Sequence, residues 1–120
     1  MNEIEAAAIS GTNDVDKAFE VLHERYPESK IVITLGGDGS RFFDGEKVYA
    51  HGIYKVKAVD TTAAGDTFTG YFLNGLLEGM APMDIMSMAA KASAIAVSQE
   101  GAADSIPTKD VVMATELELK

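Results

Sequence analysis

Hydrophobic residues recur at helical spacing near the start of the chain. Residues 3–9 predict a short helix, and Asn13 or Asp14 can cap a second helix that runs to about Tyr26. Pro27 then stops the pattern. In the second helix the hydrophobic positions recur every three or four residues and so fall on one face: Val15, Ala18, Phe19 and Leu22.

The pattern changes to strands after Pro27. Residues 30–35 form a β-branched apolar run that is typical of a buried strand, and the glycines of 36–40 force a turn. Asp44-Gly45, flanked by segments 41–44 and 46–50, indicates a hairpin with the favoured, tight type of turn. Residues 54–59 predict one further strand.

Helical spacing returns in the second half. Gly65 or Asp66 opens a helix to about Glu78, which Gly79 closes, and Pro82 starts another to about Val97. The first of these carries Phe68, Phe72, Leu76 and Leu77 on one side. The second is rich in Ala and Met, which favours close packing on a neighbouring helix or sheet, and Thr108 caps a last helix. This order predicts an α/β layered fold, with too few parallel strands for a complete doubly wound sheet.

Composition narrows the function classes. The chain has 120 residues, enough for one domain, and a net charge of −9 that would repel a phosphate backbone, so we expect no nucleic-acid partner. No apolar run reaches the ~20 residues that span a bilayer. The start of the chain lacks the features of a signal peptide and there is no Cys, so we expect a cytoplasmic protein that does not bind membranes.

The segment 59–70 carries the chemistry. A predicted strand enters it, a predicted helix leaves it, and small residues at 63–65 leave the backbone uncovered. The amides of Ala64, Gly65 and Asp66 then lie at a helix N-terminus, where they lack intrahelical acceptors and the helix dipole is positive. Backbone of this kind binds anions, including the charge that builds on a phosphoryl group during transfer. Asp66 at its rim is either a helix-terminus carboxylate or a base for an attacking hydroxyl.

The run Asp60-Thr61-Thr62-Ala63-Ala64-Gly65-Asp66-Thr67-Phe68-Thr69-Gly70 resembles the second signature of the PfkB carbohydrate kinases, the ribokinase-like family. The resemblance implies that Asp66 is the catalytic base. It also implies that the backbone of Ala63, Ala64, Gly65 and Asp66 forms the anion hole, and that the fold is the C-terminal portion of a doubly wound ribokinase-like sheet with flanking helices.

Two further segments resemble the same family. Asn2-Glu3-Ile4-Glu5 is similar to its Asn-x-x-Glu motif, which implies that Glu5, with Asn2, helps to position Mg²⁺ through water. Residues 34–39 are similar to its Thr-Leu-Gly-x-x-Gly turn beside the ATP phosphates. That turn would use Thr34, Gly36, Gly37 and Gly39. Taken alone, the first motif reads as a solvated helix start and the second as an ordinary turn.

The segment 96–107 resembles the part of the family that closes the nucleotide site and completes a site for a monovalent cation such as K⁺. The resemblance implies cation ligands in Asp60, Thr62, Ala96, Gln99 and Gly101, with Ser105 nearby. Ala90 stands where members often carry Asn or His beside the adenine, so the adenine contacts expected at this position are in question.

The resemblance begins in the middle of the family's usual sequence. We therefore expect residues 1–120 to be the C-terminal nucleotide-binding and catalytic portion of a kinase that transfers the γ-phosphoryl group of Mg-ATP to a sugar, with the sugar-binding part and lid absent. We expect such a piece to be inactive alone. Three alternatives stay open: a nucleotide-binding module without turnover, a self-associating chain, and a nucleoside or phosphosugar kinase of the same family.

Overall fold

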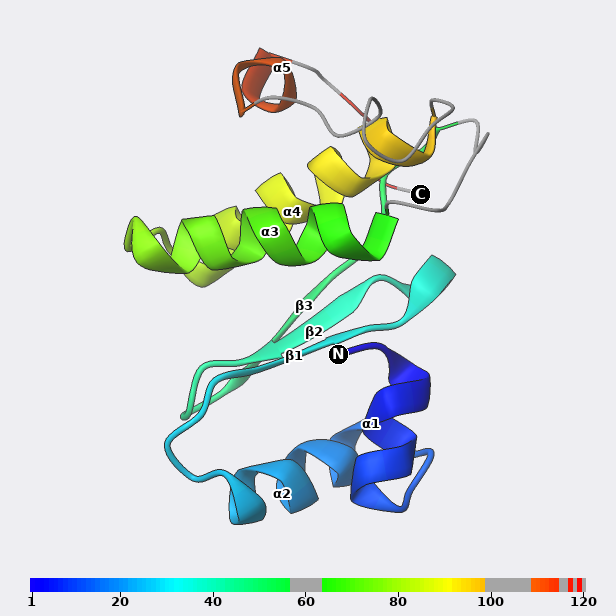
Figure 1. The fold of residues 1–120 in the computed structure, drawn as a ribbon, viewed down its shortest axis with the longest axis vertical. Coiled ribbons are helices and arrows are strands. Elements are labelled where there is room, and N and C mark those ends of the chain that lie inside the picture. Colours follow the sequence, from blue (N-terminus) through cyan, green and yellow to red (C-terminus); the bar gives the residue numbers. More distant parts are fainter. Residues whose placement is uncertain (57–63, 99–108, 115–116, 118, 120) are drawn as a thin grey trace. The chain divides into compact units, whose positions relative to one another are not determined.

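The computed structural model describes residues 1–56, 64–98, 109–114, 117 and 119 (Figure 1). The chain divides into two compact units, unit 1 (Met1–Ala50) and unit 2 (His51–Lys120). Each unit contains its own cluster of buried hydrophobic side chains.

Unit 1 begins with the two predicted helices, α1 (Glu3–Ser10) and α2 (Val15–Arg25). Gly11 ends α1 with φ of 77°, and Asp14 caps α2 by accepting the amides of Asp16 and Lys17 at 3.0 and 3.3 Å. Of the two caps that the sequence allowed, the structure uses Asp14, and the helix ends just before Tyr26 as predicted. The buried face of α2 consists of Ala18, Phe19 and Leu22, which confirms the pattern.

The strands of the sheet are β1 (Ile31–Thr34), β2 (Ser40–Phe43) and β3 (Val48–His51), in the order β1-β2-β3. β1 pairs antiparallel with β2, with Ile31 opposite Phe43 and Thr34 opposite Ser40. Along β1, only Ile31 and Ile33 are buried; Val32 and Thr34 are half-buried. β1 thus shows the alternation of a strand with one covered face, rather than the double burial that its continuous apolar run predicted.

The β2–β3 hairpin lies where the sequence predicted it, but its connection is longer than the tight turn expected. Four residues, 44–47, separate the strands. The side chain of Asp44 accepts the amides of Glu46 and Lys47 at 2.9 and 3.0 Å, and the Asp44 amide donates to Lys47 O at 3.3 Å. Gly45 adopts φ of 105°. The carboxylate of Asp44 closes this wider loop because it satisfies amides that the ladder leaves free.

Unit 2 contains α3 (Ala64–Leu77), α4 (Pro82–Val97) and α5 (Lys109–Ala114). α3 and α4 lie side by side (Figure 1). α3 ends before Gly79, which has φ of 72°, and Pro82 starts α4 as predicted. Leu77 is 89% exposed whereas Phe68 and Phe72 are buried, so the prediction that Leu77 lies on the same side of α3 as these two residues is wrong. Five residues after Phe72, Leu77 lies about 140° around the helix axis and so does not share its face.

The core of unit 2 joins α4 to α5 through Met88, Ala92, Ile95 and Val112. Of the predicted strand 54–59, Tyr54 forms only an isolated antiparallel bridge with Leu119, and 57–59 lie outside the described residues. Among the described helices, none is both long and apolar enough to cross a membrane. The architecture is α/β, as predicted.

Candidate functional site

Asn2 and Glu5 form a reciprocal capping box at the start of α1. Asn2 Oδ1 accepts the amide of Glu5 at 2.8 Å, and Glu5 Oε1 accepts the amide of Asn2 at 3.1 Å. Both residues are exposed. The arrangement brings together the two residues expected near Mg²⁺, and it also gives both a structural role, because each satisfies an amide without an intrahelical partner.

The first two residues of the chain extend alongside β1. Met1 donates its terminal amino group to Val32 O at 2.9 Å, and Thr34 donates its amide to Met1 O at 2.9 Å. Asn2 pairs with Thr34 as a parallel bridge. Because parallel segments end at the same edge of a sheet, the start of α1 and the turn after β1 lie together. Within unit 1, the structure thus unites the two predicted motifs.

The turn after β1 contains the short 3₁₀ helix η1 (Gly36–Asp38). Gly36 adopts φ of 58° and Gly39 adopts φ of 87°, and Leu35 donates its amide to Gly39 O at 2.7 Å. Gly36 and Gly37 are exposed, and a Cβ added to either would meet no atom within 4 Å. A ligand can therefore approach this backbone closely. Gly39 is buried and closes the turn, so its part is conformational.

The first turn of α3 is open to solvent. Gly65 and Asp66 are exposed, and a Cβ on Gly65 would meet nothing within 4 Å. The first amides of a helix have no intrahelical acceptors and lie at the positive end of its dipole. In unit 2, the structure thus has a glycine-lined, accessible helix start with a carboxylate beside it. Such a start can bind an anion next to a base.

Ser93, which sequence reasoning did not single out, reaches this turn from α4. Its Oγ donates to the carbonyl oxygen of Ala64 at 3.1 Å. The sequence did hold one indication of this contact, a serine within the long run of Ala and Met. A hydroxyl on a packed helical face needs a hydrogen-bond partner. Next to the turn, Thr67 is 2% exposed, and its Oγ1 has no hydrogen-bond partner among the described residues.

The remaining predicted site residues divide into two groups. Ala96, 1% exposed, lies in the last turn of α4, and Ala90, 8% exposed, lies about 1.7 turns earlier. The amide of Ser98, which caps α4, is shared among the carbonyls of Ala94, Ile95 and Ala96, so the expected role of Ala96 as a cation ligand stays a prediction. The others lie outside the described residues: Asp60, Thr62, Ala63, Gln99, Gly101 and Ser105.

The donor set near Glu5 fits a water-held Mg²⁺ rather than a metal enclosed by protein. Among the described residues there is no group of three or more His, Cys, Asp or Glu that could hold a metal. Mg²⁺ keeps several of its waters and is commonly held by one or two carboxylates together with substrate phosphates. One carboxylate with a neighbouring amide oxygen matches that requirement.

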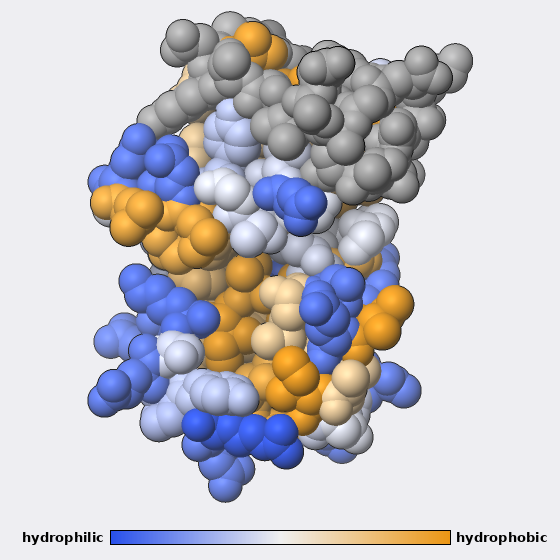
Figure 2. All heavy atoms as spheres, viewed as in Figure 1, coloured by the Kyte–Doolittle hydropathy of each residue, from blue (hydrophilic) through white to orange (hydrophobic). Residues whose placement is uncertain are grey.

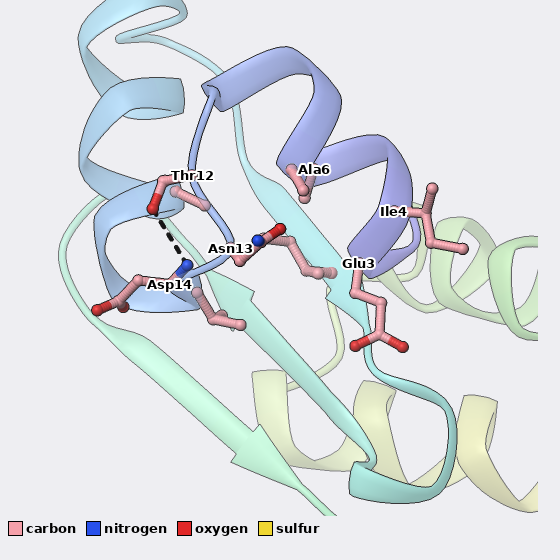
Figure 3. Close-up of a pocket in the computed structure, with 10 residues that line it drawn as sticks. Glu3, Ile4, Ala6, Thr12, Asn13 and Asp14 are labelled. Carbon is pink, nitrogen blue, oxygen red and sulfur yellow. Dashed lines mark hydrogen bonds between the residues drawn. The ribbon is translucent and has the colours of Figure 1, made fainter.

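A cavity of about 340 Å³ opens elsewhere in unit 1, between α1, the α1–α2 loop and β1 (Figure 3). Its floor is apolar, with Ala6, Ala18 and Ile33, and its rim includes Glu3, Thr12 and Asp14. Thr12 Oγ1 accepts the amide of Asp14 at 3.1 Å there. None of the predicted nucleotide or metal residues lines this cavity, so it is separate from the candidate site.

Comparison with known proteins gives a consistent result. The profile of the pfkB family carbohydrate kinases matches residues 1–109. The chain is 49% identical over 116 residues to a ribokinase of Schizosaccharomyces pombe, covering 89% of this chain and 36% of that protein. It is 37% identical over 103 residues to a ribokinase of Lactococcus lactis, covering 86% of this chain and 34% of that protein.

Among solved structures, Arabidopsis thaliana ribokinase complexed with ribose and ATP superimposes with a TM-score of 0.82 at 30% identity. The match covers 93% of this chain and 38% of the plant chain. The chain therefore spans about a third of the length of the curated relatives it matches.

Proposed function

Because the chain belongs to the pfkB family of carbohydrate kinases, we propose that it forms the nucleotide side of a kinase that transfers the γ-phosphoryl group of ATP to a sugar hydroxyl. The observation that carries this proposal is the exposed first turn of α3, where Gly65 leaves the backbone open and Asp66 stands beside it. The ribokinases to which the chain is similar, one of them complexed with ribose and ATP, favour a pentose as the acceptor.

In the proposed reaction, Asp66 accepts the proton of the attacking sugar hydroxyl as the phosphoryl group moves. A positioned general base typically contributes about 10²–10⁴-fold to the rate. The amides of Ala63, Ala64, Gly65 and Asp66 face the charge that develops on the transferred group. Backbone donors at a helix start need little reorganisation during the reaction, which makes them effective in the transition state.

The nucleotide phosphates lie along the turn of residues 34–39, where the backbone of Gly36 and Gly37 is accessible. Glu5 and Asn2 orient waters of Mg²⁺ at the adjoining start of α1. When bound, Mg²⁺ neutralises charge on the phosphates. A monovalent cation such as K⁺ takes oxygen ligands from Asp60, Thr62, Ala96, Gln99 and Gly101, with Ser105 nearby.

A second candidate function is nucleotide binding without turnover. The chain spans about a third of the length of the curated relatives, and the family resemblance implies that the sugar-binding residues lie in the part it does not cover, which favours this candidate. If the chain belongs to an active kinase, the alternative to a simple sugar as the acceptor is a nucleoside or a phosphosugar. Self-association is the third candidate. It is favoured by hydrophobic residues that reach the surface of unit 1 (Figure 2), among which Ile4 and Ile9 are exposed.

The test uses a chimera in which the N-terminal part of the S. pombe ribokinase is joined to this chain. Ribose-dependent release of ADP from Mg-ATP, abolished by Asp66→Asn, would support the kinase proposal. A folded chimera that binds Mg-ATP but releases no ADP with any sugar or nucleoside would favour binding without turnover. Calorimetric titration of the 120-residue chain with Mg-ATP, and its mass in solution at several concentrations, would separate binding from self-association.

A further inference from the structure

α3 and α4 touch at two specific places along their length. Near the end of α3, Gly75 packs directly on Ile85, and at its start Ala64 accepts the hydroxyl of Ser93. Along α3 the two contacts are about 16 Å apart, at 1.5 Å of rise per residue. The first contact is a close apolar fit of Ile85 against the helix backbone, whereas the second is a directional hydrogen bond to the backbone of the first turn.

The Ser93 bond is unusual for a helical serine. Such hydroxyls often bond the carbonyl four residues earlier in their own helix. Ser93 instead donates across to a neighbouring helix, from a helix face where Ala89, Ala92 and Ala96 are almost fully buried. Small residues at these positions let the backbones approach closely enough for a side chain as short as serine to reach a main-chain carbonyl.

The turn that receives this bond faces solvent on one side. Gly65 has no side chain, and both Gly65 and Asp66 are exposed. Thr67 and Phe68 are buried behind them and turn this face of α3 inward, and the Ser93 hydrogen bond adds a directional contact to the backbone of the turn. In an α-helix, Ala64 O also accepts the amide of Phe68, so the Ser93 bond acts on the first hydrogen-bonded turn itself.

We propose that Ser93 is a positioning residue that holds the first turn of α3, and with it the Asp66 carboxylate and the amides of residues 64–66, in a fixed orientation. This inference rests on the proposed function for its catalytic consequence, but the anchoring stands on the hydrogen bond alone. Ser93 touches no reacting atom. Displacements of about 1 Å in positioned groups can lower the rate by up to about 100-fold, so the loss of the Ser93 hydrogen bond should lower the rate measurably.

Ser87 supplies a matched control on the same helix. Its Oγ also forms one hydrogen bond, of 2.7 Å with the Tyr54 hydroxyl, and it lies away from the start of α3. Ser93→Ala and Ser87→Ala therefore each remove one side-chain hydrogen bond from α4, and only the first removes contact with Ala64. Ser93→Thr keeps a hydroxyl at the same place and serves as the rescue variant.

The anchoring is tested in the 120-residue chain by hydrogen exchange of the Phe68 amide, followed by NMR. We expect about fivefold faster exchange in Ser93→Ala than in the wild type, the factor that matches a typical net hydrogen bond. Ser87→Ala should leave this amide unchanged, and Ser93→Thr should restore its protection. Equal exchange in the Ser93→Ala and Ser87→Ala variants would overturn the proposal.

The catalytic consequence is tested in the ribokinase chimera. Ser93→Ala should lower kcat about tenfold or more and leave the KM for ATP within about twofold, while Ser87→Ala changes neither. A normal kcat in Ser93→Ala would overturn the catalytic part. A wild-type chimera that folds but shows no turnover would refute the proposed function instead, and the exchange experiment alone would then decide the role of Ser93.

Discussion

A methyl group added to Gly75 would lie 2.9 Å from Cγ1 of Ile85 and 3.0 Å from its Cγ2. Ile85 is 1% exposed and has little freedom to move. We expect Gly75→Ala to lower the free energy of unfolding by about 1–3 kcal/mol, although alanine is the better helix former. Urea unfolding followed by circular dichroism measures the change.

Gly70 provides the control for this substitution. It lies on the same helix and is exposed, and a Cβ added to it would meet no atom of the described residues within 4 Å. Gly70→Ala should therefore raise stability by about 0.5–1 kcal/mol through helix propensity alone. Equal effects of the two substitutions would show that α3 and α4 do not approach as closely at Gly75 as described.

Asp66→Asn tests the general base. In the ribokinase chimera we expect kcat to fall by about 10²–10⁴-fold, because the amide cannot accept the hydroxyl proton, while the affinity for Mg-ATP changes little. Steady-state ADP release and calorimetry measure the two quantities. Asp84, an exposed acid in the first turn of α4, offers the matched control. A loss of similar size in Asp84→Asn would point to net charge rather than a positioned base.

Gly65→Val tests the anion hole. An added Cβ at Gly65 meets no atom of the described residues within 4 Å, so we expect the fold to be retained, while the larger side chain would cover the amides of this turn. We expect the affinity of the chimera for Mg-ATP to fall tenfold or more, since hydrogen bonds to charged groups contribute about 1.5–3 kcal/mol. Gly70→Val, with equally open surroundings, should leave the affinity unchanged. Identical affinities in both variants would remove these amides from the phosphate site.

Glu5→Gln separates the two roles of the capping box. The amide oxygen of Gln can still accept the Asn2 amide, so the start of α1 should be kept and thermal stability should change little. If Glu5 also orients the waters of Mg²⁺, the loss of its charge should raise the Mg²⁺ concentration needed for half-maximal activity of the chimera several-fold. An unchanged Mg²⁺ requirement would assign Glu5 to capping alone, and Glu3→Gln is the comparison.

Asp44 gives the hairpin a dependence on pH. The amides of Lys47 and then Glu46 hold the pKa of its carboxyl below the usual 3.8. A lowered pKa in the folded state stabilises the protein above about pH 3.8, and this contribution is lost as the pH falls through the folded value. We expect the wild type to lose more stability than Asp44→Asn on acidification to about pH 2, as measured by urea unfolding at each pH. Parallel pH profiles would contradict this role.

Local signals predicted most of the helices, and tertiary contacts account for what they missed. Asp14 and Pro82 act within one turn of the helices they start, so the sequence located both boundaries. The loop after β2 was predicted too short, because the Asp44 side chain bonds two amides and stabilises a wider connection than Asp44-Gly45 suggests. Leu77 was misplaced because it follows Phe72 by five residues, which turns it about 140° away from that face of the helix.

The candidate site shows the same division. Asp66 and Gly65 could be proposed from the sequence because their motif is contiguous, and the turn after β1 could be proposed from its glycines. The anchoring of the first turn of α3 by Ser93 depends on how closely α3 and α4 approach each other. Ser93 and Ala64 are 29 residues apart in the sequence, and no local pattern encodes the distance between them in the fold. The parallel pairing of Asn2 with Thr34 is likewise a property of the sheet rather than of either segment.

The bond between the Met1 carbonyl and Thr34 also bears on the order in which the chain folds. It joins residues 33 apart, so closing this loop costs more chain entropy than forming a local contact does. α3 and α4 are joined by a few residues and meet at a much lower entropic cost. Because long-range contacts form late, we expect the α3–α4 pair to appear first and the start of α1 to reach its sheet register last. The motif Asn2–Glu5 would then be among the last parts of unit 1 to acquire its native geometry.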